Sequence, residues 1–249
     1  MKTIAIVQRK GGNGKSTSCL NLARSLSLKG KRVLIVDLDD QKNSTQSIPF
    51  ENKIAHTVDE VLVNDELVVK DAVTATDWKG VKVIAGSSNL SGVIRELDGE
   101  VGSHLVLKEK LDEVKDDFDF CLIDTSPSLN ILVVNALCAA DYAFIPLSSK
   151  YFSLQGRGQT LESISKVQKR LSPNLKILGI AFVIYDGRAS LSKEVVSKTS
   201  EEYKDYVLKT VVNQNVRIEE AQTARMTIFD YRRTDRGALQ YEVLCEEIL

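Results

Sequence analysis

The sequence predicts an α/β protein with a mostly parallel, twisted sheet that is covered by helices on both faces. Short apolar, β-branched runs alternate with amphipathic, helix-forming stretches along the whole chain. This alternation is typical of strands joined by helical crossovers, which bury both faces of a parallel sheet. No internal repeat, low-complexity tract or linker interrupts the sequence, so we expect a single domain over residues 1–249.

The first expected strand and helix enclose a glycine-rich loop. The apolar run 3–7 is typical of a buried strand, and the helix is expected from Ser18 to Leu28, with Gly30 as its stop signal. Between them lies R-K-G-G-N-G-K-S-T, residues 9–17. This stretch is compatible with a Walker A phosphate-binding loop, although K-G-G departs from the general spacing.

The residue types of this loop suit the chemistry of nucleotide phosphates. Glycines let successive backbone N–H groups point into one concavity, and the N-terminus of the helix adds partial positive charge. Lys15 supplies an ammonium group for the β- and γ-phosphates, and the Ser16 hydroxyl is placed to ligate Mg²⁺. We therefore expect a nucleotide-binding P-loop. The candidate cofactor-binding residues in the loop are Gly11, Gly12, Asn13, Gly14, Lys15, Ser16 and Thr17.

Lys10 makes the loop more specific than a general Walker A motif. With K-G-G-N-G-K-S-T, the chain resembles the deviant Walker A ATPases of the ParA/MinD family. In that family the extra lysine reaches across a dimer interface to the nucleotide of the partner subunit. The resemblance therefore implies an ATP-dependent homodimer in which Lys10 and Lys15 both act in catalysis. Ordinary surface charge is the alternative role for Lys10.

A second buried run, residues 33–39, ends in acids. Carboxylates at the carboxyl end of a parallel strand, beside a phosphate loop, can orient water or the Mg²⁺ shell. The stretch D-L-D-D-Q-K-N-S-T resembles the family motif D-x-D-P-Q-G-N-x-T. The match implies that Asp39 positions the attacking water. Asp40 and Lys42 stand where the motif usually has proline and glycine.

The segment between this strand and residue 118 gives weaker signals. Thr57 and Glu60 have the spacing of a capping box at the start of a short helix. We expect, in order, this helix, a loop or short element, a strand and two further helices, at 57–62, 71–78, 81–86, 87–97 and 105–114.

The run 118–124 has the pattern of a Walker B strand, in which apolar residues lead to an aspartate that holds Mg²⁺ through water. We therefore predict that Ser16 and Asp124 bind the metal. The following T-S-P-S-L resembles the switch loop of the family, with Ser126 at a position often held by proline. The helices and strands expected after it alternate, at 131–140, 141–147, 153–171, 177–185, 190–203 and 207–212.

Arginines in the last third of the chain indicate a contact with nucleic acid. D-G-R after a strand, and N-V-R-I-E-E-A at the opening of a helical stretch, resemble the ParA branch of the family, which implies that Arg188 and Arg217 bind DNA nonspecifically. Arginines hold phosphate oxygens bidentately and release counterions. Acidic residues are interleaved here, so pairing of Arg217 within the chain is the alternative. By the same resemblance, Asn213 is a candidate for contact with the adenine.

Composition and charge limit the classes of function. A net charge of −1 excludes a generally basic nucleic-acid coat, so DNA contact depends on a local patch. The four cysteines are scattered in apolar runs without metal-ligand spacing, which indicates reduced thiols in a cytoplasmic protein. We expect no signal peptide and no membrane span. The amphipathic C-terminal stretch is acidic, so an anionic membrane would repel it and it is expected to pack on the sheet.

The leading interpretation is a ParA-like ATPase for plasmid or chromosome partition. The resemblance implies that the ATP-bound dimer binds DNA on the nucleoid, that hydrolysis releases it, and that a ParB-like centromere-binding or adaptor protein stimulates hydrolysis. Three alternatives stay open: an ATPase that positions a non-DNA cargo, a MinD-like membrane-associated ATPase, and a small-molecule kinase or synthetase of the same fold.

Overall fold

The structure is a computed structural model that describes residues 1–50, 53–149 and 153–249. One sheet of eight strands forms its centre, in the order β3-β4-β2-β5-β1-β6-β7-β8. Neighbouring strands are parallel except for β3 and β4. The strands are β1 Lys2–Ile6, β2 Val33–Leu38, β3 Val73–Ala75, β4 Val81–Ile84, β5 Phe120–Thr125, β6 Tyr142–Ser148, β7 Lys176–Tyr185 and β8 Val207–Asn213.

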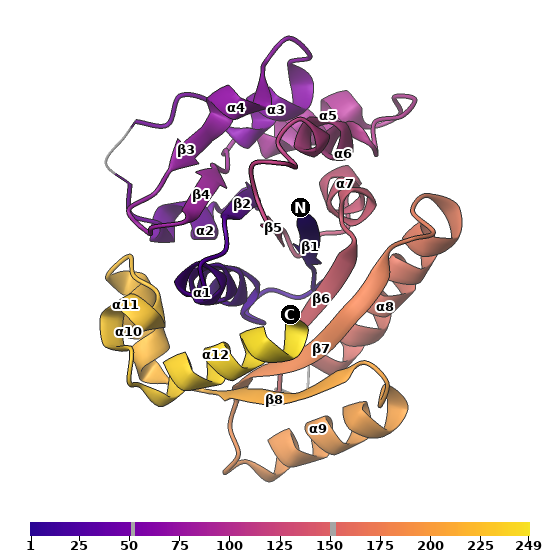
Figure 1. The fold of residues 1–249 in the computed structure, drawn as a ribbon. Coiled ribbons are helices and arrows are strands. Elements are labelled where there is room, and N and C mark those ends of the chain that lie inside the picture. Colours follow the sequence, from indigo (N-terminus) through magenta and orange to yellow (C-terminus); the bar gives the residue numbers. More distant parts are fainter. Residues whose placement is uncertain (51–52, 150–152) are drawn as a thin grey trace.

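Helices cover both faces of this sheet, as Figure 1 shows. The predicted α/β class with a mostly parallel sheet is therefore confirmed. The helices are α1 Lys15–Leu28, α2 Asn43–Ser47, α3 Val58–Val63, α4 Val69–Ala72, α5 Leu90–Leu97, α6 Val106–Asp112, α7 Ile131–Ala139, α8 Ser153–Arg170, α9 Ser190–Glu202, α10 Val216–Thr223, α11 Ile228–Arg232 and α12 Arg236–Ile248.

Two apolar clusters, one on each face, hold the layers together. Every residue of β2 and β5 is buried, as expected for central strands that are covered on both sides. One cluster joins the sheet to α3 and to α5 through α8, and the other joins it to α1, α11 and α12. Burial of apolar area on both faces is the main stabilising contribution to such a fold.

The C-terminal helix α12 packs on the sheet, as the sequence predicts. Tyr241 and Leu244 are fully buried in the cluster that contains α1. On the polar side of the helix, the Glu247 carboxylate accepts hydrogen bonds from the backbone N–H groups of Lys209 and Thr210 in β8. In the ranges that the structure describes, no helix combines the length and apolar character needed to cross a membrane.

Two expectations need correction, on the start of the first helix and on the end of the strand expected at 81–86. The first helix begins at Lys15 and not at Ser18, because Gly14 adopts a left-handed conformation and forms its N-cap. The segment 71–78, expected as a loop or short element, does contain a short element, the three-residue strand β3 at the edge of the sheet. The expected third strand is therefore β4, and it ends at Ile84 and not at Gly86.

The topology brings the predicted polar residues to one edge of the sheet. β2, β5 and β1 are adjacent and parallel, so their carboxyl ends lie together. Asp37 is in register with Asp124, and Asp124 is in register with Ile6, the last residue of the strand that leads into the glycine-rich loop. Ligands of open parallel sheets bind at such an edge.

Candidate functional site

The glycine-rich loop between β1 and α1 forms the centre of the site. Gly12 and Gly14 have φ values of 74° and 75°, which residues with a side chain rarely adopt. A Cβ atom at Gly14 would also lie only 3.0 Å from Cγ2 of Val183 in β7. The two glycines therefore let the chain turn tightly into α1, whose N-terminal N–H groups favour an anion.

The side chain of Asn13 forms hydrogen bonds both within this loop and to the sheet. Its side chain is buried, its Nδ2 donates to the carbonyl oxygen of Lys10 at 3.1 Å, and its Oδ1 accepts the N–H of Ser148 in β6 at 3.1 Å. The side chain of Asn13 thus fixes the loop to the sheet. In the described part of the chain, Lys10 and Asn13 are absent from the lining of the cleft that the rest of the loop forms.

The loop lines a cleft of about 540 Å³. The cleft is bounded by the loop, the first turn of α1, the chain after β2, the switch segment after β5, and α10. Six of the predicted residues in the loop and helix, together with Asp39, meet here. The lining residues are Gly11, Gly12, Gly14, Lys15, Ser16, Thr17, Asp39, Gln41, Asn43, Ser47, Pro127, Gln222 and Thr223.

A second pocket of about 220 Å³ adjoins this cleft. The two share Gly12, Gly14, Thr17 and Gln222. The predicted adenine-contacting residue Asn213 lines the second pocket, together with apolar side chains from β7, β8, α10 and α12. A pocket lined by both apolar and polar side chains, connected to a cleft that suits phosphates, is the form of a nucleotide site.

Buried charged side chains lie close together in and behind the wall of the cleft. Burial lowers the pKa of Lys15, and the nearby carboxylates of Asp124 and Asp39 act in the opposite direction. Burial raises the pKa of Asp124 and of Asp39 above the ordinary range of a carboxyl group. The same cause raises the pKa of Asp37 to about 7. Such a cluster gains from a bound cation, because a cation compensates the desolvated carboxylates.

Asp124 has the geometry of a metal-binding carboxylate. Its Oδ2 accepts a hydrogen bond of 2.7 Å from the Ser44 hydroxyl, whereas its Oδ1 is buried and accepts none from any described residue. Ser16, the other predicted metal ligand, lines the cleft beside Lys15. One carboxylate and one hydroxyl beside a phosphate site fit Mg²⁺, which takes most of its ligands from water and phosphates.

Asp37 organises the loop that carries Asp39. Oδ2 of Asp37 accepts both the N–H and the hydroxyl of Thr45, at 2.8 and 2.7 Å, and its Oδ1 accepts the N–H of Asp39 at 3.1 Å. Lys42 takes the left-handed conformation, with φ of 54°, which a glycine would adopt at less cost. Lys42 thus adopts the backbone conformation typical of glycine, the residue that the family motif usually has at this position.

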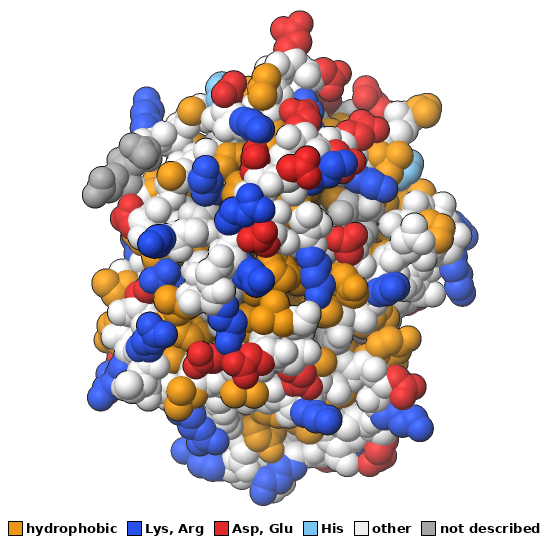
Figure 2. Space-filling model, in the orientation of Figure 1, with side chains coloured by type: hydrophobic (Ala, Val, Ile, Leu, Met, Phe, Trp, Pro, Cys, Tyr) orange, Lys and Arg blue, Asp and Glu red, His pale blue; other side chains and the backbone are white. Residues whose placement is uncertain are grey.

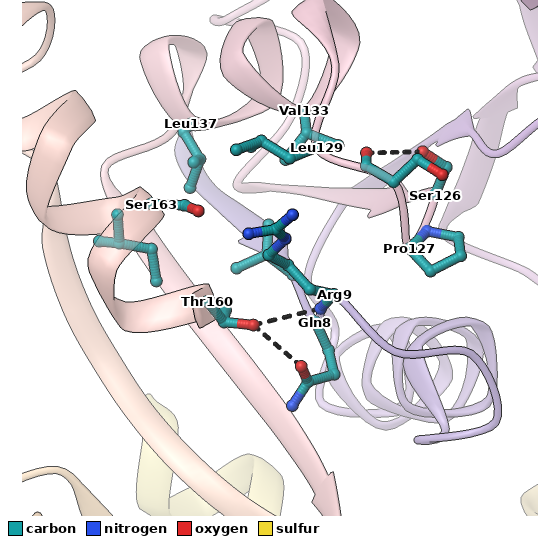
Figure 3. Close-up of a pocket in the computed structure, with 12 residues that line it drawn as sticks. Gln8, Arg9, Ser126, Pro127, Leu129, Val133, Leu137, Thr160 and Ser163 are labelled. Carbon is teal, nitrogen blue, oxygen red and sulfur yellow. Dashed lines mark hydrogen bonds between the residues drawn. The ribbon is translucent and has the colours of Figure 1, made fainter. Parts of the chain in front are cut away.

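Figure 3 shows a contact that the sequence analysis missed, between the start of the loop and α8. The hydroxyl of Thr160 donates to Oε1 of Gln8 at 2.9 Å and accepts the backbone N–H of Arg9 at 3.1 Å. Ser126 and Pro127 of the switch segment line the same small pocket. The loop, α8 and the switch segment thus contact one another on this side.

The two predicted DNA-binding arginines lie outside both cavities. Arg188, in the turn before α9, has 92% of its side chain exposed and pairs with Asp186. Arg217, at the start of α10, is 46% exposed and pairs with Glu220 at 2.6 Å, so the pairing that we left as an alternative does occur. Figure 2 shows basic side chains along the lower edge of the molecule, where α9 and the turn before it lie.

The chain is similar in sequence to known proteins over most of its length. Residues 1–177 match the family model described as an AAA domain. The chromosome-partitioning ATPase Soj of Treponema pallidum is 39% identical over 248 residues, which cover 100% of this chain and 97% of the relative. The chain belongs to the ParA/MinD family of P-loop ATPases. It is therefore an enzyme that hydrolyses ATP to ADP and phosphate.

Two other known proteins are similar to nearly the whole chain. The sporulation initiation inhibitor protein Soj of Bacillus subtilis is 37% identical over 248 residues, which cover 99% of this chain and 98% of the relative. The crystal structure of cobyrinic acid a,c-diamide synthase from Mycobacterium smegmatis, with bound ADP and magnesium, has a TM-score of 0.85 at 30% identity. That match covers 99% of this chain and 93% of the synthase chain.

Proposed function

We propose that this chain is a chromosome-partitioning ATPase that forms a dimer on binding ATP and Mg²⁺, binds DNA without sequence preference as the dimer, and leaves DNA after hydrolysis. The observation that carries the proposal is the similarity over the full length to an ATPase whose name states that it partitions chromosomes. The phosphate cleft, with its lysine and acids, supports the ATP-dependent part.

Each cleft residue has a role that its position supports. Lys15 neutralises the β- and γ-phosphates, and the glycines admit those phosphates close to the backbone. Ser16 and Asp124 hold Mg²⁺, which compensates phosphate charge. Asp39 lies at the wall of the cleft and orients the attacking water. Asn213 contacts the adenine in the adjoining pocket.

Lys10 acts on the partner subunit in this proposal. It lies in the phosphate loop, yet it is absent from the described lining of the cleft in its own chain. A second copy facing the loop would bring its own Lys10 to the nucleotide of the first. The bound nucleotide would thus be shared by the two subunits, and the dimer would depend on ATP.

Arg188 and Arg217 contribute the DNA contact. Both are exposed, and both can exchange a carboxylate partner for a phosphate oxygen, since surface ion pairs are weak. Further basic residues extend the patch on the same elements and on the chain after α10. They are Lys193, Arg225, Arg232, Arg233 and Arg236. A ParB-like protein at the centromere stimulates hydrolysis and so releases the dimer from the nucleoid.

A DNA-binding assay with three nucleotide states tests this function. Duplex DNA of random sequence is incubated with the protein and ATP, ADP or no nucleotide, with Mg²⁺ present. We expect binding with ATP and at least about tenfold weaker binding with ADP or without nucleotide, because only the dimer presents two patches to one duplex. Lys15→Ala serves as the control that binds neither nucleotide nor DNA.

The same assay separates the alternatives. Hydrolysis of ATP with no binding to DNA in any state would favour positioning of a non-DNA cargo. A MinD-like membrane role receives little support from α12, because its main apolar side is buried on the sheet and its exposed side carries glutamates beside Leu239 and Val243.

A further inference from the structure

Gln222 lies at the junction of the two cavities. The phosphate cleft and the adjoining pocket share Gly12, Gly14, Thr17 and Gln222, and only the last two of these have side chains beyond a hydrogen. Nε2 of Gln222 donates to Oγ1 of Thr17 at 2.8 Å. The polar side chains at this junction are therefore one hydroxyl and one amide, already bonded to each other.

A bound nucleotide must place its sugar at this junction. With the phosphates at Lys15 and Ser16 and the base in the pocket lined by Asn213, the sugar connects the two and passes the shared residues. The pocket walls contributed by Ile184, Val212 and Ile218 are apolar and cannot pair with a sugar hydroxyl. The pocket has further polar lining residues, which do not line the phosphate cleft and so lie on the side assigned to the base: Asn213, Gln214, Asn215, Glu219 and Tyr241.

The amide of Gln222 is oriented before any ligand arrives. Because Nε2 is directed at Thr17, Oε1 is the acceptor that remains on the same planar group, and no residue in the described ranges donates to it. The helix that carries Gln222 is also anchored: Ala221 is buried, and Ile218 packs in the cluster that contains α1. An acceptor that is held in place loses little conformational entropy when it binds a hydroxyl.

The segment after α10 fixes this helix to α1, the helix that begins at the phosphate loop. The N–H of Ile228 donates to Oδ1 of Asn21 at 3.0 Å, and Arg24 pairs with Asp230 at 2.6 Å. Gln222 is therefore positioned by the same helix that positions Lys15 and Ser16.

We propose that Gln222 is a specificity residue for the sugar: its Oε1 accepts a hydrogen bond from a ribose hydroxyl, and the site thereby prefers ribonucleotides to deoxyribonucleotides. This inference rests on the proposed placement of the nucleotide across the two cavities. A site that pairs with a hydroxyl discriminates against a ligand without that hydroxyl, because the acceptor is then left unpaired.

The test compares nucleotides that are not hydrolysed by an ATPase. Calorimetry with Mg²⁺ gives the affinities of wild type, Gln222→Leu and Gln222→Glu for ADP, 2′-deoxy-ADP and 3′-deoxy-ADP. In the wild type we expect at least one deoxy analogue to bind about 3- to 10-fold more weakly than ADP, as for loss of one neutral hydrogen bond. Gln222→Leu should weaken ADP by the same factor and remove the preference. Gln222→Glu retains the acceptor and should retain the preference.

Three results would overturn the inference. They are equal affinity of the wild type for all three nucleotides, a preference that persists in Gln222→Leu, and a loss of affinity in Gln222→Leu that is equal for all three. The last result would mean that Gln222 only supports the fold of the site. Because the measurement does not involve DNA, it stands or falls separately from the proposed binding to DNA.

Discussion

Asp37, Asp39 and Asp124 are three buried carboxylates with different surroundings, and these surroundings separate their roles. Asp37 is fully buried and is saturated by Thr45 and the backbone of the following loop. Asp124 keeps one oxygen without a partner among the described residues. Asp39 lines the cleft and accepts a backbone N–H from Gln41 at 3.0 Å. The geometry therefore supports a structural role for the first, a metal ligand for the second and a contact with water for the third.

Replacement of Asp39 by alanine should separate binding from hydrolysis. We expect Asp39→Ala to bind ATP within a few-fold of wild type and to lower turnover by at least about 100-fold, the usual contribution of a positioned acid or base. Phosphate release and calorimetry measure the two effects. Asp40→Ala, which changes the exposed neighbouring acid, is the matched control. Turnover of Asp39→Ala equal to that of wild type would show that another residue orients the water.

Lys42 allows a prediction on backbone strain. Its φ of 54° is unfavourable for a residue with a side chain, and its Nζ donates to the Ser88 hydroxyl at 2.8 Å. Lys42→Gly should raise the free energy of unfolding by up to about 1 kcal/mol or leave it unchanged, because the released strain offsets the lost hydrogen bond. Lys42→Val should lower it by more than about 1 kcal/mol, because a β-branched residue resists this conformation. Urea denaturation measures both changes. A large loss in Lys42→Gly would mean that the bond to Ser88 outweighs the strain.

At the scale of residues, the sequence predicted those functional groups whose chemistry requires a fixed local spacing. The glycines, Lys15 and Ser16 are adjacent in the chain, and phosphate binding needs them in that order. The bond between Thr160 and Gln8 joins residues 152 positions apart, and the bond between Ser44 and Asp124 spans 80 positions. Contacts of this kind depend on how strands and helices pack, which local patterns do not specify.

Elements were predicted well where they are long or buried. The runs that became β2 and β5 are continuously apolar, and the capping-box spacing at Thr57 and Glu60 marks the start of α3 correctly. β3 was not identified as a strand, since three residues at an edge leave almost no periodic signal. The early start of α1 depends on the left-handed conformation of Gly14, which sequence periodicity does not reveal.

An ion pair joins the amino ends of two central strands and should make stability depend on pH. Arg32, directly before β2, holds the pKa of Asp119, directly before β5, at about 2, below its ordinary value of 3.8. A carboxyl group with a lowered pKa in the folded state stabilises the protein above its unfolded pKa, and this contribution is lost as the pH falls toward the folded pKa.

Thermal unfolding of wild type and Asp119→Asn over a range of pH measures this contribution. The wild type should have the higher Tm near neutral pH, and the difference should close between about pH 4 and pH 2 as Asp119 becomes protonated. The pair is exposed, so the difference should be small. A difference that is the same at every pH would show that the carboxylate charge is not its cause.

At the scale of the whole molecule, the proposed mechanism needs two copies. Lys10→Ala should leave monomers that bind nucleotide but do not dimerise, because the lysine would act on the nucleotide of the partner. Light scattering with a nonhydrolysable ATP analogue measures the mass of the complex, and wild type with the same analogue is the control. A normal dimer of Lys10→Ala would assign Lys10 to surface charge.

We propose that the ATP-bound protein holds DNA through phosphate contacts of Arg188 and Arg217. Both arginines are outside the nucleotide cavities, so their replacement should spare ATP-dependent dimerisation. Each engages a carboxylate in the free protein, and this pair must open before the arginine reaches a phosphate.

The most direct test is the salt dependence of DNA binding, with ATP, by wild type, Arg188→Ala and Arg217→Ala. Phosphate contacts release counterions, so log affinity should fall linearly with log salt concentration and should not depend on the DNA sequence. Each variant should bind more weakly and flatten the slope by about one unit for each lost contact, hence by about two in a dimer. If both variants bind DNA like wild type at every salt concentration, these arginines do not contact DNA and the account is contradicted.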